Sequence, residues 1–144
     1  MTIHTQAVAS NWSFPTEVRF GNGRIREIGA AVRALGASSP LVVTDAGLKD
    51  LFPVQRALEA LREAGLQPGL FFNVKPNPTG RNVADGVEVL RSGGHDLVVA
   101  IGGGSALDAA KAIALMSSQT ISMWDLEDIG DNWKRVDTSR LVPV

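Results

Sequence analysis

Three consecutive glycines followed by a serine carry the clearest chemical signal in this sequence. Residues 102–105 (GGGS) come directly after the apolar segment 97–101 and open an apolar helix. Glycines let a backbone approach an anion without a Cβ in the way, and the first free N–H groups of a helix point toward that anion. We therefore expect a phosphate-binding loop, in which Ser105 caps the helix and adds a hydroxyl donor.

The residues after this loop refine the expectation. The loop matches neither G-x-G-x-x-G nor G-x-x-x-x-G-K-[ST], and a plain turn between strand and helix needs fewer than three glycines. Asp108 follows Ser105 by three residues, where a carboxylate can accept from free backbone N–H groups and hold the loop rigid. Lys111 lies one helical turn further on and is expected to pair with Asp108 rather than to act in catalysis.

Two further polar residues follow expected strands. Asp45 ends an apolar strand, and a carboxylate there can accept both hydroxyl protons of an adenosine ribose and would repel a 2′-phosphate, which favours NAD over NADP. Capping of the turn at Ala46 and Gly47 explains Asp45 equally well. Asn77 lies between two prolines, where its amide can either reach a nucleotide or stabilise the turn.

Composition and charge exclude other classes of function. The chain has 144 residues, 14 basic against 15 acidic side chains, and no run of like charges longer than two, which argues against nucleic-acid or anionic-membrane binding. It has no cysteine, and its histidines, His4 and His95, form no metal-ligand motif, so His95 is expected at the surface. Trp12, Trp124 and Trp133 are too scattered for a stacking platform and are expected to pack. Neither a signal peptide nor a membrane span is recognisable, so we expect a cytoplasmic protein.

Strand and helix patterns alternate along the chain. The expected strands cover residues 14–20, 41–44, 70–74 and 97–101, and the expected helices have apolar faces at 25–35, 51–61 and 83–90, with a fourth opening after residue 104. Thr79 is the expected N-cap of the third helix. This alternation predicts an α/β fold, a Rossmann-like parallel sheet with helices on both faces.

The two ends of the chain differ from this regular part. Residues 1–11 are polar and unpatterned, and we expect a flexible N-terminus there, followed by one domain over residues 12–144. Pro15 indicates that the first strand is an edge strand. Residues 117–139 are irregular, with at most a short helix, and residues 141–144 (LVPV) resemble the start of a buried strand, as if the sequence continued beyond them.

These motifs together resemble the iron-containing, or group III, alcohol dehydrogenases, which are grouped with glycerol dehydrogenase and dehydroquinate synthase. The resemblance spans residues 14–144 and is carried by residues 14–21 (FPTEVRFG), 42–45 (VVTD), 75–79 (KPNPT) and 102–105 (GGGS), with Asp108 and Lys111. It implies a dehydroquinate synthase-like N-terminal domain. It also implies that Asp45 and Asn77 contact the adenosine side of NAD, while Gly103, Gly104, Ser105 and Asp108 hold the pyrophosphate loop.

The resemblance further implies an activity, NAD-dependent oxidation of a small alcohol or reduction of an aldehyde, assisted by a divalent metal that is usually Fe²⁺. The family holds that metal in a C-terminal helical domain, which is absent from this sequence, so no catalytic or metal-binding residue is expected here. A stand-alone nucleotide-binding module without catalysis is the alternative, and a glycerol dehydrogenase or dehydroquinate synthase relative is the alternative within the enzymes. Ser105, where glycerol dehydrogenases tend to carry lysine, argues against the former of these relatives. The family also implies a homodimer paired through the N-terminal edge strand.

Overall fold

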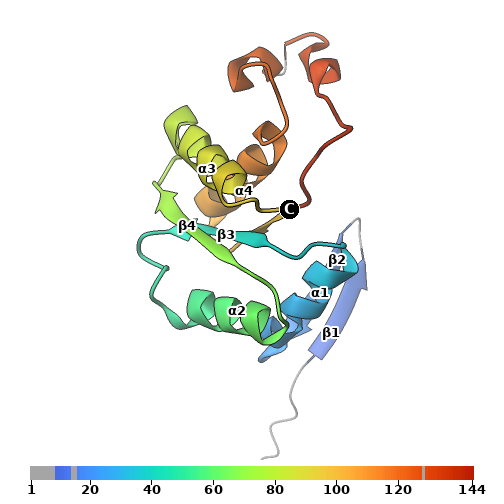
Figure 1. Ribbon diagram of the computed structural model, residues 1–144, viewed down its shortest axis with the longest axis vertical. Coiled ribbons are helices and arrows are strands. Elements are labelled where there is room, and N and C mark those ends of the chain that lie inside the picture. The colour runs from blue at the N-terminus through green and yellow to red at the C-terminus, as the bar shows by residue number, and fades with distance from the viewer. Residues whose placement is uncertain (1–8, 14–15, 128) are drawn as a thin grey trace, which may run out of the picture.

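The computed structural model describes residues 9–13, 16–127 and 129–144, and it has the α/β architecture expected from the sequence (Figure 1). A parallel sheet has the strand order β4-β3-β5, and a separate antiparallel pair joins β1 to β2. The strands are β1 (Ala9–Ser13), β2 (Glu17–Gly21), β3 (Pro40–Asp45), β4 (Gly69–Val74) and β5 (Leu97–Ala100). The helices are η1 (Arg24–Glu27), α1 (Ile28–Ala34), α2 (Phe52–Glu63), α3 (Gly80–Ser92), α4 (Gly104–Met116), η2 (Met123–Leu126) and η3 (Asn132–Arg135).

The central strand, β3, organises the hydrophobic core. Its residues alternate between two faces, and from Leu41 to Thr44 every side chain is fully buried. Leu41 and Val43 belong to one apolar cluster with residues of α3 and α4, whereas Val42 belongs to a second cluster with residues of α1 and α2. Helices therefore cover both faces of the parallel sheet, as the unbroken apolar run in this strand indicates (Figure 1).

The N-terminal region differs from the expectation of a single strand over residues 14–20. Residues 9–13 pair with residues 17–21 as an antiparallel hairpin in which Ala9 lies opposite Gly21. The expected boundary between a flexible segment and the domain, at residues 11 and 12, therefore falls inside a strand. Residues 9–13 (ASNWS) show no apolar alternation, and without that signal the sequence did not predict a strand there. Phe14, Pro15 and His4 lie outside the described residues.

The C-terminal region also differs from the expectation. Residues 117–139 contain the two short helices η2 and η3, but residues 141–144 form no strand. The Val98 N–H donates to the Pro143 carbonyl oxygen at 2.8 Å, so this segment runs beside β5. Val142 packs against the core, but Leu141 and Val144 are exposed rather than buried.

A closed polar network joins the amino ends of β3 and β5. The Asp96 carboxylate accepts from the Ser38 N–H, the Ser38 hydroxyl and the Ser39 N–H at 2.8 to 2.9 Å. The His95 ring lies against Gly69 and Gly93, and its Nδ1 is 3.0 Å from the Ser39 Oγ. The expectation that His95 is a surface residue is therefore wrong, because the residue is half-buried and hydrogen-bonded.

Two helices on one face of the sheet approach each other through a glycine. Gly86 of α3 is buried, and a Cβ added there would collide with Cδ1 of Ile113 in α4. The close approach lets residues of both helices join one apolar cluster with Val43 and Phe71. This glycine is therefore required by packing, although it weakens the helix that contains it.

Replacement of Gly86 should test that packing. We expect Gly86→Ala to lower the free energy of unfolding by up to about 2 kcal/mol, because overpacking costs about 1–3 kcal/mol while the helix gains roughly 1 kcal/mol from the alanine. Ile113→Val removes the colliding methyl group, so the double variant should lose less than the sum of the two single variants. Urea unfolding measures all three, and strictly additive losses would contradict a direct collision.

The Asp96 network should make stability depend on pH. Burial raises the pKa of Asp96, but the hydrogen bonds from the Ser38 and Ser39 N–H groups and the Ser38 hydroxyl outweigh it, so the pKa lies below its usual value. Because its pKa is lower in the folded than in the unfolded state, the ionised Asp96 stabilises the fold at pH values above its unfolded pKa of about 3.9. This stabilisation is lost as the pH falls through the pKa of Asp96 in the folded state. We expect Asp96→Asn to cost about 1–2 kcal/mol at neutral pH and progressively less below pH of about 4. Urea midpoints at several pH values would show this, and a pH-independent loss would refute it.

Candidate functional site

The carboxyl ends of the three parallel strands meet at one edge of the sheet, and a cavity of about 450 Å³ lies there. It is lined by residues 45–47 after β3, residues 74–76 at the end of β4, and residues 103–106 at the start of α4. Ligands of open α/β sheets bind outside the carboxyl ends of the strands. The cavity therefore joins the loops in which the sequence placed its candidate residues.

The glycine loop turns the chain from β5 into α4. Gly102 has a φ of 148°, a backbone conformation that favours glycine, and a Cβ there would lie 2.8 Å from the Ala106 Cβ. A Cβ at Gly103 or Gly104 would meet no atom within 4 Å. The fold therefore requires glycine at position 102, whereas the two following glycines leave open space in front of the helix N-terminus.

Ser105 lies at this N-terminus but does not cap it. The N-cap of α4 is Gly103, which has no side chain, and Ser105 is the second residue of the helix. The expectation of a Ser105 cap is therefore wrong by two positions. The Ser105 Oγ instead accepts from the Asn77 N–H at 3.3 Å, so the helix start is tied to the loop after β4.

Asn77 has an unusual backbone conformation. Its φ is 52°, and among the described residues it is the only one other than glycine that has a positive φ. Asparagine tolerates this region better than most residues, and such conformations are often found at ligand sites. The structure brings Asn77 next to Ser105 through the bond described above, while the contact of Asn77 with a nucleotide stays a prediction.

Thr79, the expected N-cap, does precede α3, and its N–H donates to the Asn82 Oδ1 at 3.1 Å.

The two oxygens of the Asp45 carboxylate have different surroundings. Oδ1 accepts from the Gly47 N–H at 2.9 Å and the Leu48 N–H at 3.1 Å, which confirms the turn-capping interpretation. Oδ2 faces Gly102, since a Cβ on that glycine would lie 3.6 Å from it. One oxygen therefore holds the turn while the other lies on the side of the glycine loop, so capping does not prevent a second role.

Asp108 is placed differently from the sequence-based expectation. It is the fifth residue of α4, too far along the helix to accept from the free N–H groups of the first turn, and its side chain is 73% exposed. The expected cap on the loop is therefore wrong. The expected pair with Lys111 is present, at 3.8 Å between Nζ and Oδ1, and such an exposed pair contributes little to stability. Contact between Asp108 and a cofactor stays a prediction.

Lys75 is the cavity residue that sequence reasoning missed. It follows β4 directly, is exposed, and lines the cavity together with Asp45. The signal that could have identified it is a cationic residue one position beyond the end of a parallel strand, at the same sheet edge as the other candidates.

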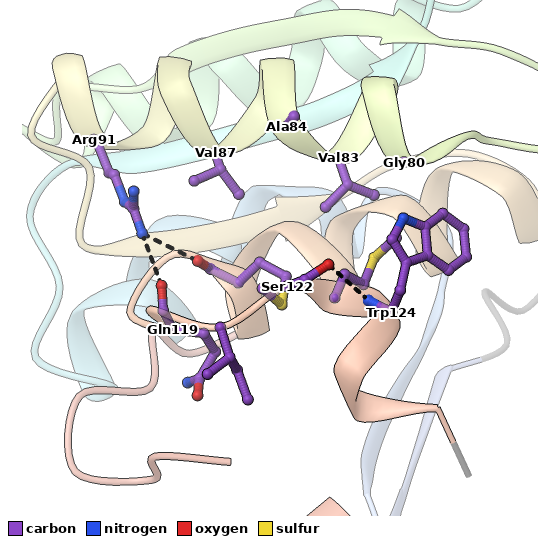
Figure 2. A pocket seen from close by; sticks show the side chains of 11 residues that line it. Gly80, Val83, Ala84, Val87, Arg91, Gln119, Ser122 and Trp124 are labelled. Carbon is purple, nitrogen blue, oxygen red and sulfur yellow. Dashed lines mark hydrogen bonds between the residues drawn. The ribbon is translucent and has the colours of Figure 1, made fainter. Parts of the chain in front are cut away.

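A second cavity, of about 300 Å³, lies between α3 and the segment that follows α4 (Figure 2). Val83 and Val87 line it from α3, and Trp124 closes one end. Arg91 donates to the backbone oxygens of Ser117, Met116 and Gln119 at 2.8 to 3.4 Å, so its guanidinium holds the end of α4. No other charged side chain lines this cavity among the described residues, which leaves it without an obvious chemistry.

The tryptophans do not pack as expected. Trp124 is 63% exposed and Trp133 is 59% exposed, because they lie in the two short helices outside the core, and the Trp12 side chain lies outside the described residues. Within those residues, no three His, Cys, Asp or Glu side chains are grouped so as to hold a metal ion. No helix in the same part of the chain is long and apolar enough to span a bilayer.

A glycine-rich loop that opens a helix at the carboxyl edge of a parallel sheet is typical of dinucleotide-binding α/β domains. The family model for iron-containing alcohol dehydrogenases matches residues 15–144, and the chain belongs to this family. This confirms the resemblance noted in the sequence and the fold that it implies.

Several relatives are similar over most of this chain. The choline dehydrogenase of Bacillus subtilis (strain 168) is 36% identical over 127 residues, which are 88% of this chain and 32% of that protein. The NAD-dependent methanol dehydrogenase of Bacillus methanolicus is 36% identical over 76% of this chain and 29% of its own length. The structure of sulfoacetaldehyde reductase from Bifidobacterium kashiwanohense in complex with NAD⁺ matches with a TM-score of 0.69 and 33% identity over 77% of this chain and 29% of that chain. The chain thus spans about a third of the length of the curated relatives it matches.

Proposed function

We propose that this chain supplies the NAD-binding part of an NAD-dependent dehydrogenase that interconverts a small alcohol and its aldehyde. The observation that carries the proposal is the cavity in which Asp45, two unobstructed glycines and Ser105 meet at one sheet edge. Membership of the iron-containing alcohol dehydrogenase family and the NAD named for two of its relatives support it. A cytoplasmic location is part of the same proposal.

The residues of the cavity fit a dinucleotide. The N–H groups at the start of α4 would bind the pyrophosphate, which Gly103 and Gly104 can approach because a Cβ there would occupy open space. Ser105 would add a hydroxyl donor, with Asp108 nearby on the same helix. The free side of the Asp45 carboxylate would accept from the adenosine ribose hydroxyls, and Asn77 would contact the adenosine side. When bound, NAD supplies the chemistry by accepting or donating a hydride.

The metal of the family does not fit the residues at hand. Fe²⁺ or another divalent ion needs several convergent ligands, and the described residues hold no group of three His, Cys, Asp or Glu side chains. We therefore assign to this chain the binding and orientation of NAD, and propose that metal-assisted chemistry belongs to the full-length family enzyme. A nucleotide-binding module without catalysis would share the same site and differ only in lacking turnover.

Replacement of Gly104 tests the proposed site. We expect the chain to bind NAD, and NADP more weakly, in calorimetric titrations, and Gly104→Val to abolish NAD binding because a branched side chain would fill the space in front of the helix N-terminus. Since a Cβ at this position meets no protein atom within 4 Å, the melting temperature should change little. A Gly104→Val variant that is folded and binds NAD as tightly as the unmodified chain would show that the loop is only structural.

We also propose a homodimer paired through the N-terminal hairpin. Residues 17–20 of β2 are exposed on both faces, including Val18 at 45%, and an isolated two-stranded hairpin is marginally stable in water. A second copy could cover this hairpin and pair with its edge.

Sedimentation equilibrium should therefore show a monomer–dimer equilibrium. We expect Val18→Lys to shift it toward the monomer by about tenfold or more, because a charge would be buried in the interface. Leu35→Lys, at an exposed apolar residue outside the hairpin, serves as the control and should leave the equilibrium unchanged. A chain that stays monomeric at high concentration, or a larger effect of the control, would argue against this interface.

A further inference from the structure

Two charged side chains of opposite sign line the cavity at the carboxyl edge of the sheet. They are Asp45 and Lys75, and the other lining residues within the described chain are uncharged. Asp45 ends β3 and lies in register with Val74 of β4, so Lys75 is one residue beyond the partner of Asp45. The two charges therefore lie at the carboxyl ends of neighbouring strands and line the same cavity.

Lys75 and Asp45 do not neutralise each other directly. The Asp45 Oδ1 is already engaged by the turn at Gly47 and Leu48, and no ion pair between Lys75 and Asp45 is found among the described residues. The loop that follows Lys75 is fixed by two prolines and by the bond from Asn77 to Ser105. The position of Lys75 at the cavity is thus set by the backbone of this loop and not by attraction to Asp45.

Strand order and register together indicate which part of a dinucleotide Lys75 can reach. In the order β4-β3-β5, Gly103 and Gly104 follow β5 on one side of β3, whereas Lys75 follows β4 on the other side. Both loops line the same cavity: Asn77, two residues beyond Lys75, reaches Ser105 of the glycine loop, whereas Lys75 directly follows Val74, the register partner of Asp45. A cation in this place is adjacent to the group that binds the Asp45 carboxylate, which in the proposed function is the adenosine ribose.

We propose that Lys75 is a specificity-determining residue that contacts the ribose 2′-phosphate of NADP and so offsets its repulsion by Asp45. This inference rests on the proposed function, because it assigns the ribose to Asp45. A lysine ammonium is a strongly hydrated point charge and a common phosphate ligand, and it would find no comparable anion at the 2′-hydroxyl of NAD. The chain then prefers NAD only modestly, although Asp45 by itself predicts strong discrimination against NADP.

The test compares NAD and NADP binding by calorimetry for the full chain and its variants. Lys75→Gln should weaken NADP binding about three- to tenfold and leave NAD binding within about twofold, since one partly exposed charge-assisted contact is lost. The loss should shrink when the salt concentration is raised to about 0.5 M, because exposed charges are screened. Lys134→Gln removes the same charge from a lysine that pairs with Asp131 in η3 and should affect neither nucleotide.

A second background separates direct contact from an indirect effect. Asp45→Asn keeps an oxygen acceptor for the turn and removes the negative charge, so NADP binding should tighten. If Lys75 contacts the phosphate, Lys75→Gln should weaken NADP binding in this background as well. Disappearance of the effect there would mean that Lys75 acts only through Asp45, and the inference would be overturned.

The remaining outcomes distinguish this inference from the proposed function. Equal weakening of NAD and NADP by Lys75→Gln would place Lys75 at the pyrophosphate, and no weakening of either would remove it from the site, so both results overturn the inference while leaving NAD binding intact. Failure of the unmodified chain to bind either nucleotide would instead refute the proposed function itself.

Discussion

Parallel pairing of β3 on both of its edges is the constraint on which the rest of the structure depends. With β4 on one side and β5 on the other, the backbone of β3 is bonded on both edges and its side chains from Pro40 to Thr44 are removed from water. Parallel neighbours require crossover connections, so amphipathic helices must cover the two faces. Because the three strands run in the same direction, their carboxyl ends also meet, and the loops that follow them are brought within reach of one another.

Burial of the β3 side chains has a cost at Thr44, whose hydroxyl is buried without a partner among the described residues.

The two ends of this sheet differ in how their polar groups are satisfied. At the amino end, Asp96 and His95 are bound within the protein by Ser38 and Ser39, and the network is closed. At the carboxyl end, Lys75 is exposed and one oxygen of Asp45 takes no part in the turn. A closed network contributes rigidity, whereas groups left without protein partners are able to receive a ligand. The contrast supports a binding role for the second end independently of the relatives.

Much of this arrangement could be predicted from the sequence, because hydrophobic periodicity reports burial and burial decides the elements. The continuous apolar run in β3 and the helical spacing in α2 and α3 both gave the correct element, and Thr79 was correctly expected to precede α3. The failures concern features that leave no periodic trace. Strand β1 is held by backbone pairing, and the start of α4 falls at Gly103 because the turn ends there, which moves Ser105 and Asp108 two positions further into the helix than expected. Lys75 was missed because its relevance comes from a neighbouring strand, 30 residues earlier in the chain.

The two oxygens of the Asp45 carboxylate have separate surroundings, and this restricts how the region can diverge among related sequences. A substitute must still accept from the N–H groups of Gly47 and Leu48, which a short oxygen-bearing side chain such as asparagine, serine or threonine can do. Glutamate keeps the charge, but its extra methylene group takes the carboxylate away from the turn. The local backbone therefore allows the charge to be lost more easily than it allows the side chain to be lengthened. Any evolutionary drift in nucleotide preference at this position would pass through small polar residues, with the shape of the loop unchanged.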